Sequence, residues 1–217
     1  MSRRALRPLI LFLALAGSSA ALAQKAPAQG GKKVIVLVGL PGSGKSTAAG
    51  RLSAKLNGVP RWTSGDVIRN TIRARGLPYT PENDKAVAAE FAGKPGEIGR
   101  RIAAEVAAAP GGVAIVEGFR TPADLAEMKK AFPDTIVVSI EVSAKRRYQR
   151  MLGRGRAGED NVAFLQKRDQ RELGLGVREV MKQATVRIRP RGNDLDSLDR
   201  SLDRVRRMVE PSPTSER

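Results

Sequence analysis

The stretch that most constrains the fold is KVIVLVGLPGSGKST, residues 33–47. It opens with a run of β-branched and other apolar residues, which is typical of a strand buried on both faces of a parallel sheet. Three glycines follow within six residues, and then come Lys45, Ser46 and Thr47. A G-x-x-x-x-G-K-S pattern between a strand and a helix forms a loop whose backbone N–H groups point at a phosphate. The chain is therefore predicted to hold a strand, a phosphate-binding loop and a helix in direct succession.

The members of this loop have separate tasks in holding a nucleoside triphosphate. Lys45 reaches the β- and γ-phosphates, and the Ser46 hydroxyl binds Mg²⁺. The positive end of the following helix adds to the attraction for the anion. We therefore expect ATP and Mg²⁺ as cofactors. The residues expected to contact the phosphates are Gly39, Leu40, Pro41, Gly42, Ser43, Gly44, Lys45, Ser46 and Thr47.

Apolar runs recur along the chain and alternate with helical patterns. Strands are expected at 33–38, 61–63, 113–116, 135–142 and 185–188. Helices are expected at 46–56, 67–75, 81–92, 97–108, 122–131, 144–152, 161–173, 177–183 and 195–209. This alternation predicts a three-layer α/β P-loop NTPase fold, in which helices flank a parallel sheet of about five strands. The domain is expected to span residues 33–209, with a small lid at about 153–160.

The first 23 residues follow the order of a secretory signal peptide. A basic start precedes an apolar run over residues 9–16, and small residues end the segment at Ala21 to Ala23. That run is too short to cross a bilayer, so no membrane span is expected after cleavage. The signal predicts an exported, periplasmic protein, whereas a downstream start of translation would leave it in the cytoplasm. Residues 24–32 are expected to form a flexible linker and residues 210–217 a disordered tail.

Composition narrows the chemistry further. The formal net charge of +17 favours an anionic partner, such as a phosphate compound, a nucleic acid or a membrane surface. Neither cysteine nor histidine occurs, which excludes disulfides, thiolate chemistry and the usual general base. Aromatic residues make up only 4% of the chain, which is few for stacking on bases. Specific nucleic-acid binding is therefore not expected.

Three further segments resemble one family of enzymes. TSGDVIR at residues 63–69 looks like the segment around the second strand of nucleoside monophosphate kinases. VEGFRTPADL at 116–125 is similar to their D-G-F-P-R-T segment, with one proline missing and Glu117 in place of the aspartate. The arginine-rich block at 146–172 is similar to their lid and its flanking helices. The chain thus resembles the adenylate-kinase-like group, and within it a little-characterised archaeal and bacterial branch that is also similar to dephospho-coenzyme A kinase.

The resemblance implies a nucleotide kinase fold and gives individual arginines a role. Phosphoryl transfer between polyanions needs converging positive charge, and the block at 146–172 supplies it. On the ATP side the resemblance implies contacts from Arg150, Arg154, Arg156 and Arg168. Arg154 and Arg156, together with Lys45, are expected to act in catalysis as the lid closes.

The acceptor side is expected around two other arginines. Arg69 and Arg120 each follow a predicted strand, at the edge where open parallel sheets bind ligands. The resemblance assigns both to the phosphate of the acceptor. Asp66 is expected to orient Arg69 and the water shell of Mg²⁺, and with a hydroxyl acceptor it would serve as general base. Glu117, together with Ser46, is expected to hold Mg²⁺, through water in the case of Glu117.

The expected function is an ATP-dependent phosphotransferase whose acceptor is a nucleotide-like small molecule bearing a phosphate. One alternative is a kinase of a small hydroxyl compound with Asp66 as its base. Another is an exported protein that binds ATP or another nucleotide without catalysis. The chain contains no N-K-x-D guanine signature, which lowers the case for a GTPase.

Overall fold

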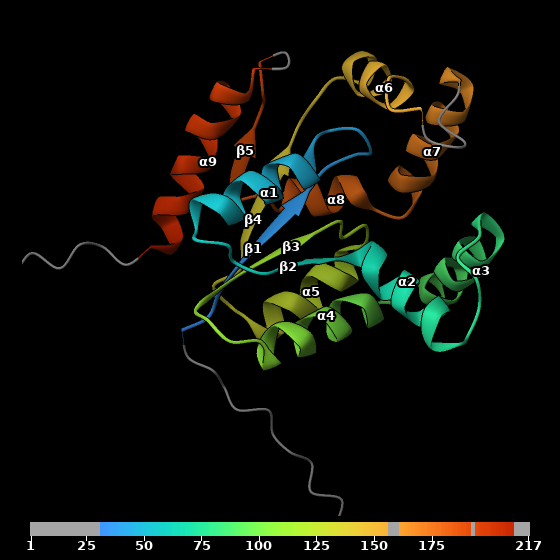
Figure 1. Ribbon diagram of the computed structural model, residues 1–217, viewed down its shortest axis with the longest axis horizontal. Coiled ribbons are helices and arrows are strands. Elements are labelled where there is room, and N and C mark those ends of the chain that lie inside the picture. Colours follow the sequence, from blue (N-terminus) through green and yellow to red (C-terminus); the bar gives the residue numbers. More distant parts are fainter. Residues whose placement is uncertain (1–30, 156–160, 192–193, 211–217) are drawn as a thin grey trace, which may run out of the picture.

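The computed structural model describes residues 31–155, 161–191 and 194–210. The predicted signal peptide, most of the predicted linker, residues 156–160 of the predicted lid and the tail from residue 211 lie outside the described residues. Within them, one sheet has the strand order β2-β3-β1-β4-β5 (Figure 1). These strands are β1 (Lys33–Val38), β2 (Arg61–Thr63), β3 (Val113–Glu117), β4 (Ile136–Ile140) and β5 (Val186–Ile188).

All four strand pairs are parallel, as the alternation of strands and helices predicts. The helices are α1 (Lys45–Lys55), α2 (Ser64–Ala74), α3 (Pro81–Ala92), α4 (Glu97–Ala108), α5 (Pro122–Ala131), α6 (Ala144–Leu152), α7 (Val162–Gly174), α8 (Val177–Lys182) and α9 (Leu195–Val209). Helix α2 starts three residues earlier than expected, because the Thr63 hydroxyl accepts a hydrogen bond from the Asp66 N–H at 3.0 Å and caps the helix there. Among the described residues, no helix has the length and apolarity needed to span a bilayer.

Strand β1 lies in the middle of the sheet and is buried on both faces. Val34, Val36 and Val38 belong to one apolar cluster, while Ile35 and Leu37 belong to another. Successive side chains of a strand point to opposite faces, so this division places a core on each side of the sheet. Helices α1 and α9 cover one face, and α4, α5 and α8 cover the other (Figure 1). The molecule is therefore a three-layer α/β structure, as expected.

The carboxyl edge of the sheet collects the predicted site segments. Val36 of β1 lies opposite Val116 of β3 and Val137 of β4, so the three central strands end at nearly the same level. The phosphate loop, the start of α2 and the segment after β3 therefore all emerge at this edge. Helices α6 and α7 flank it on one side and α2 and α3 on the other (Figure 1). Ligands of open α/β sheets bind at such an edge.

Helix α1 packs against one face of the sheet and contributes to the apolar core there. Leu52 of α1 is fully buried, whereas Leu77 is 43% exposed. We expect Leu52→Ala to lower the free energy of unfolding by about 2–5 kcal/mol, because it removes apolar contacts and leaves a cavity. The matched variant Leu77→Ala should change it by no more than about 0.5 kcal/mol. Urea denaturation followed by circular dichroism measures both, and equal effects would contradict the assignment of the core.

Candidate active site

The loop between β1 and α1 adopts a backbone conformation that needs glycine. Gly42 has a φ of 76°, and a Cβ there would lie 2.8 Å from both the Arg147 carbonyl and the Met151 Sδ. Any side chain at this position would push the loop away from α6. Gly44, with φ 94°, precedes α1 and forms no side-chain cap with it. The first N–H groups of α1 therefore have no side-chain acceptor at the cap and can donate to an anion.

Lys45 turns back onto the loop that carries it. Its Nζ donates hydrogen bonds to the Gly39 carbonyl at 2.7 Å and to the Leu40 carbonyl at 3.1 Å. Burial lowers the pKa of Lys45 from its usual 10.5 to about 8. A lysine held in this way gains a strong partner when a phosphate enters the loop.

Charges of both signs surround the Lys45 ammonium. The carboxylates of Glu172 and Glu117 raise its pKa, while Arg120 and Arg168 lower it, all against the larger effect of burial. The fold thus brings Lys45 together with three residues expected from the sequence: Glu117, Arg120 and Arg168. Glu172, on α7, is a further member that the sequence reasoning missed. In the sequence, Glu172 stands out only by its position one helical turn after Arg168. That spacing alone does not show that Glu172 faces Lys45.

Ser46 and Glu117 form the pair expected for Mg²⁺. Glu117 ends β3, is 5% exposed, and accepts a hydrogen bond from the Ser46 hydroxyl at 2.7 Å. A hydroxyl and a carboxylate at this distance, next to a phosphate loop, suit a cation that keeps several waters and takes its other ligands from phosphates. The donor set fits Mg²⁺, and the longer side chain of glutamate still reaches the hydroxyl that would bind it.

Arg120 is held by the buried carboxylate of Glu172. Its Nε lies 3.0 Å from the Glu172 Oε2, and the Glu172 side chain is only 4% exposed. The Arg120 side chain itself remains 38% exposed, so part of the guanidinium still faces solvent. The pair joins the end of β3 to α7. Arg120 is thereby positioned at the carboxyl edge, where the sequence predicted an acceptor phosphate.

Asp66 and Arg69 form a second polar pair on α2. Arg69 Nη2 donates to Asp66 Oδ1 at 2.6 Å, and the Thr63 hydroxyl donates to Asp66 Oδ2 at 2.9 Å. Burial alone would raise the pKa of Asp66, but the hydrogen bonds from Arg69 and Thr63 bring it below its usual value. Asp66 therefore stays ionised and holds the Arg69 guanidinium. The exposed Tyr79, which follows α2, also helps to raise the pKa of Arg69 and was missed from the sequence.

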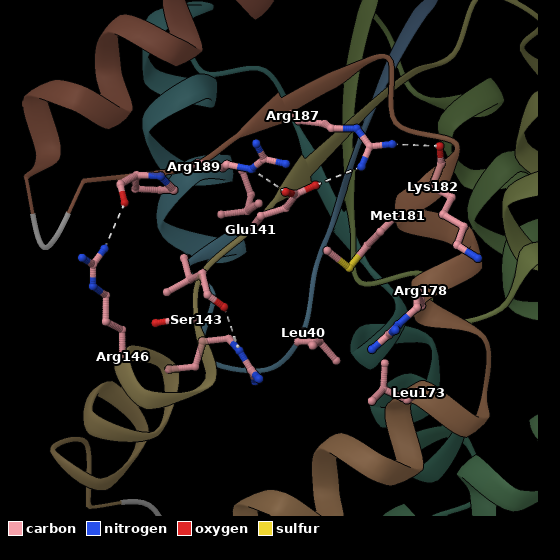
Figure 2. Close-up of a pocket in the computed structure, with 14 residues that line it drawn as sticks. Leu40, Glu141, Ser143, Arg146, Leu173, Arg178, Met181, Lys182, Arg187 and Arg189 are labelled. Atoms are coloured by element: carbon pink, nitrogen blue, oxygen red, sulfur yellow. Dashed lines mark hydrogen bonds and ion pairs between the residues drawn. The ribbon is translucent and has the colours of Figure 1, made fainter.

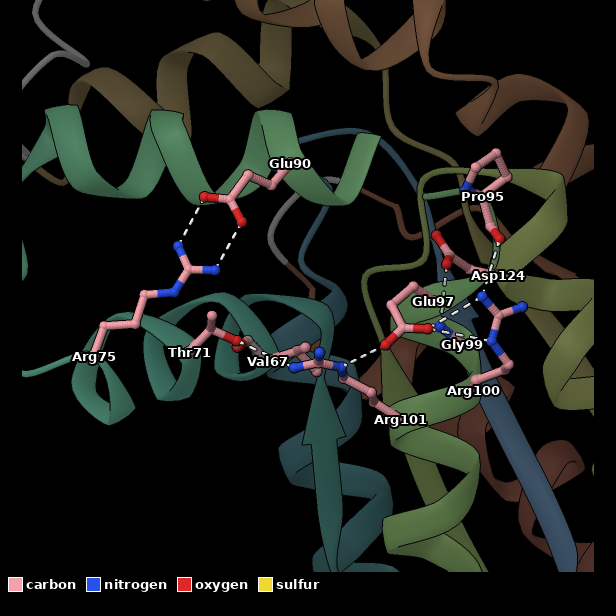
Figure 3. Close-up of polar contacts among 10 residues, drawn as sticks. All are labelled: Val67, Thr71, Arg75, Glu90, Pro95, Glu97, Gly99, Arg100, Arg101 and Asp124. Carbon is pink, nitrogen blue, oxygen red and sulfur yellow. Dashed lines mark hydrogen bonds and ion pairs between the residues drawn. The ribbon is translucent and has the colours of Figure 1, made fainter. Parts of the chain in front are cut away.

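Helices α2 and α3, which carry this side of the site, are tied to each other at their margin (Figure 3). Arg75 donates two hydrogen bonds of 2.7 Å to the carboxylate of Glu90. Arg101 of α4 donates to Glu97 at 2.9 Å and to the Thr71 hydroxyl of α2 at 3.4 Å (Figure 3). Solvent screens these surface pairs, so they add little stability. Apolar packing, rather than ion pairs, therefore holds α2 and α3 in place.

A cavity of about 560 Å³ opens beside the phosphate loop. Residues 42–47 form one wall, and Arg150 and Arg154 also line the cavity. Arg150 Nη1 also donates to the Ser43 carbonyl at 3.4 Å, a long contact. The sequence predicted these arginines but not the opposite wall, which comes from the start of α9 and the segment before it. That wall consists of Pro190, Asp194, Leu195 and Leu198.

Arg147, one of the basic residues of the predicted lid block, has a structural place instead. It is 3% exposed and forms an ion pair with Asp169 of α7. Its Nη1 also donates to the Pro41 carbonyl at 2.9 Å, and its Nε donates to the Val142 carbonyl at 3.2 Å. Arg147 thus fastens the phosphate loop to α6 and α7. Arg156, predicted as a catalytic lid residue, lies outside the described residues.

Comparison with known proteins agrees with this geometry. Residues 38–165 match the family described as AAA domain. The UPF0200 protein of Methanoculleus marisnigri is 36% identical over 72% of this chain and 86% of its own length. The UPF0200 protein of Pyrococcus horikoshii is 35% identical over 70% of this chain and 84% of its own length. The chain belongs to the AAA domain family and to the UPF0200 family.

Solved structures related to this UPF0200 chain share its fold. TT1252 from Thermus thermophilus superposes with a TM-score of 0.58 at 19% identity, over 83% of this chain and all of its own length (100%). Shikimate kinase from Acinetobacter baumannii, in complex with shikimate, gives a TM-score of 0.53 at 18% identity, over 82% of this chain and 93% of its own. The UPF0200 chain therefore has the P-loop kinase-like fold, which confirms the predicted fold class.

The lowered pKa of Lys45 makes phosphate binding depend on pH. A bound phosphate stabilises the ammonium and raises its pKa again, so binding at a pH above about 8 must take up a proton. We expect ATP binding without metal to take up clearly more protons at pH 9 than at pH 7. Titration calorimetry in buffers of different ionisation enthalpy measures the uptake. Lys45→Arg, whose guanidinium does not titrate, should bind without it; an uptake that is the same at both pH values would contradict the role of Lys45.

Proposed function

We propose that the chain is an ATP- and Mg²⁺-dependent phosphotransferase that acts on a nucleotide-like small molecule bearing a phosphate. The observation that carries the proposal is the cluster around Lys45. The phosphate loop, the Ser46–Glu117 pair, Arg168 of α7 and Arg120 after β3 meet at one edge of the sheet. Such an arrangement suits two anionic groups brought face to face, because positive groups converge from both sides.

The two halves of the site would have different tasks. The loop and Lys45 would hold the triphosphate, with its nucleoside in the cavity lined by Arg150 and the start of α9. Ser46 and Glu117 would hold Mg²⁺, which neutralises phosphate charge. Arg69, oriented by Asp66, would hold the phosphate of the acceptor. Arg120 would contact the same phosphate through the part of its guanidinium that faces solvent.

The reaction moves one phosphoryl group. The bond between the γ-phosphorus and the bridging oxygen breaks, and ADP leaves with the electron pair. A new bond forms between that phosphorus and an oxygen of the acceptor. Lys45 and the lid arginines Arg154 and Arg156 would stabilise the negative charge that moves between the two oxygens in the transition state. Such electrostatic stabilisation is the main source of catalysis in phosphoryl transfer.

The hydroxyl-compound alternative has less support from the site. A general base works best with a pKa near the working pH, whereas Arg69 and Thr63 keep the pKa of Asp66 below its usual value. The shikimate kinases among the structural relatives support the fold only, since their identity to this chain is 18%. A binding protein without turnover is the other alternative, and it differs from the proposal in kinetics alone.

Two further expectations rest on the sequence and stay predictions. Export rests on residues 1–23, with a cytoplasmic protein as the alternative if translation starts downstream. The absence of specific nucleic-acid binding rests on the low aromatic content and on the clustering of the basic excess in the predicted lid block.

Lys45→Ala should reduce ATP turnover at least 100-fold, because removal of a charged group that stabilises the transition state costs about 10²–10³ in rate. The measurement is ADP release with Mg²⁺ and a panel of nucleoside monophosphates. Lys55→Ala is the matched control, because Lys55 lies on the same helix and pairs with Asp203 at 2.8 Å, away from the loop. Turnover with hydroxyl compounds but not with monophosphates would favour the first alternative. ATP binding without any turnover would favour the second.

Arg69→Ala should raise the KM for the acceptor about 10- to 100-fold, since a charge-assisted hydrogen bond contributes about 1.5–3 kcal/mol. The KM for ATP should change less than about threefold, because Arg69 lies on the opposite side of the site. Arg73→Ala is the control: it removes an arginine of the same helix, whose Nη1 donates to the Asn70 side chain at 3.1 Å. A rise in the KM for ATP alone would mean that the two halves of the site are assigned the wrong way round.

A further inference from the structure

A second cavity lies on the other side of the phosphate loop. Its volume is about 590 Å³, and it sits beyond the ends of β4 and β5, between α6 and α8 (Figure 2). Leu40 is the loop residue that lines it, whereas residues 42–47 line the cavity already described. Ile140 and Pro190 contribute to both cavities and separate them. No part of the proposed reaction uses this space.

Positive charge in this cavity exceeds negative charge. Besides Arg147, which Asp169 neutralises, the lining includes five basic side chains. These are Arg146, Arg178, Lys182, Arg187 and Arg189. Glu141 is the one carboxylate among the described residues that line the cavity. The excess makes an anion the natural ligand.

Glu141 is shared by two arginines. Arg189 Nε donates to it at 2.8 Å and Arg187 Nη1 at 3.2 Å, on either side of the carboxylate (Figure 2). Burial would raise the pKa of Glu141, but these arginines and the Ser139 hydroxyl lower it. The carboxylate is therefore ionised at neutral pH and balances only one of its two partners.

The other cations of the cavity have little compensation. Among the described residues, Arg146 Nη1 donates to the Pro190 carbonyl alone, at 3.5 Å, and Lys182 lies 3.9 Å from Glu179 on its own helix. Arg178 is exposed on α8, and no residue in the described part of the chain pairs with it. Figure 2 shows its guanidinium beside the cavity, above Leu173. Arg178 is thus the cation best placed to meet a ligand.

The remaining wall of the cavity is apolar. Leu40, Val142, Leu173 and Met181 line it, and Figure 2 shows Leu40, Leu173 and Met181 around its inner side. A small inorganic anion would leave this wall without contacts. A ligand with an apolar body as well as a charged group would bury both halves, which is the usual composition of a small-molecule site of this size.

We propose that this cavity is a second ligand site, which binds a small organic phosphate with an apolar body. Arg178 contacts the phosphate, and Leu40, Leu173 and Met181 contact the apolar part. The site lies on the other side of the phosphate loop from the proposed active site and does not depend on the proposed function. The groove between β5 and α9, lined by Arg191, Arg200 and Arg204, is basic but lacks a comparable apolar wall, and it serves as the control.

Methionine methyl groups provide a direct readout. The full chain, labelled with ¹³C at the methionine methyls, is titrated with phenyl phosphate and, separately, with inorganic phosphate. Met181 reports on this cavity, and Met151, whose Sδ lies beside Gly42, reports on the phosphate loop. The Met181 signal is assigned with Met181→Leu. We expect phenyl phosphate to shift the Met181 signal saturably, and to the same extent in the Lys45→Ala variant. At this cavity, phenyl phosphate should bind at least fivefold more tightly than inorganic phosphate.

Charge variants then test the residues. Arg178→Ala should weaken the Met181 response to phenyl phosphate about tenfold. Arg204→Ala, which removes an equal charge from the control groove, should change it less than twofold. A Met181 signal that does not move, or that moves only when Lys45 is intact, overturns the proposal. Equal losses in Arg178→Ala and Arg204→Ala, or equal affinities for the two phosphates, also overturn it, because either result means general attraction of anions.

Discussion

The buried ion pair of Arg147 and Asp169 is the contact on which the arrangement of the site depends. Arg147 also donates to the Pro41 and Val142 carbonyls, so one side chain joins the phosphate loop, the end of β4 and helix α7. Breaking a buried pair by removing one partner leaves an uncompensated charge and costs about 3–5 kcal/mol. The pair is therefore difficult to lose, and the loop keeps a fixed position relative to the helix that carries Arg168 and Glu172.

That fixed position explains the balance of charges around Lys45. Helix α7 contributes Glu172 and Arg168, and strand β3 contributes Glu117 and the segment that leads to Arg120. The carboxylates partly compensate the positive charges, which would otherwise repel one another strongly in a region partly removed from bulk water. A polyanion entering this edge meets lysine and arginine side chains that are already oriented, and little reorganisation remains for the moment of reaction.

The two faces of the phosphate loop offer different environments. Residues 42–47 face a cavity that α9 completes, whereas Leu40 faces a cavity with a basic rim and an apolar wall. The loop is thin because its glycines allow the chain to turn tightly. A single turn of backbone can therefore form part of two ligand sites, with Pro190 and Ile140 as the partition between them.

Local sequence patterns predict the secondary-structure elements and the chemistry of the phosphate loop. Residues 33–47 predict a buried strand, a phosphate grip and a helix from local patterns, and the other apolar runs predict a parallel sheet. Contacts between distant segments could not be predicted in this way, because the charge and spacing of residues do not indicate which partner a side chain contacts. The three-dimensional structure was needed to show that Arg120 pairs with Glu172. It was also needed to show that Arg147 is buried in an ion pair rather than exposed on a lid, and that α9 lines the cavity beside the loop. These contacts join residues far apart in the chain, and they form only when the helices settle on the sheet.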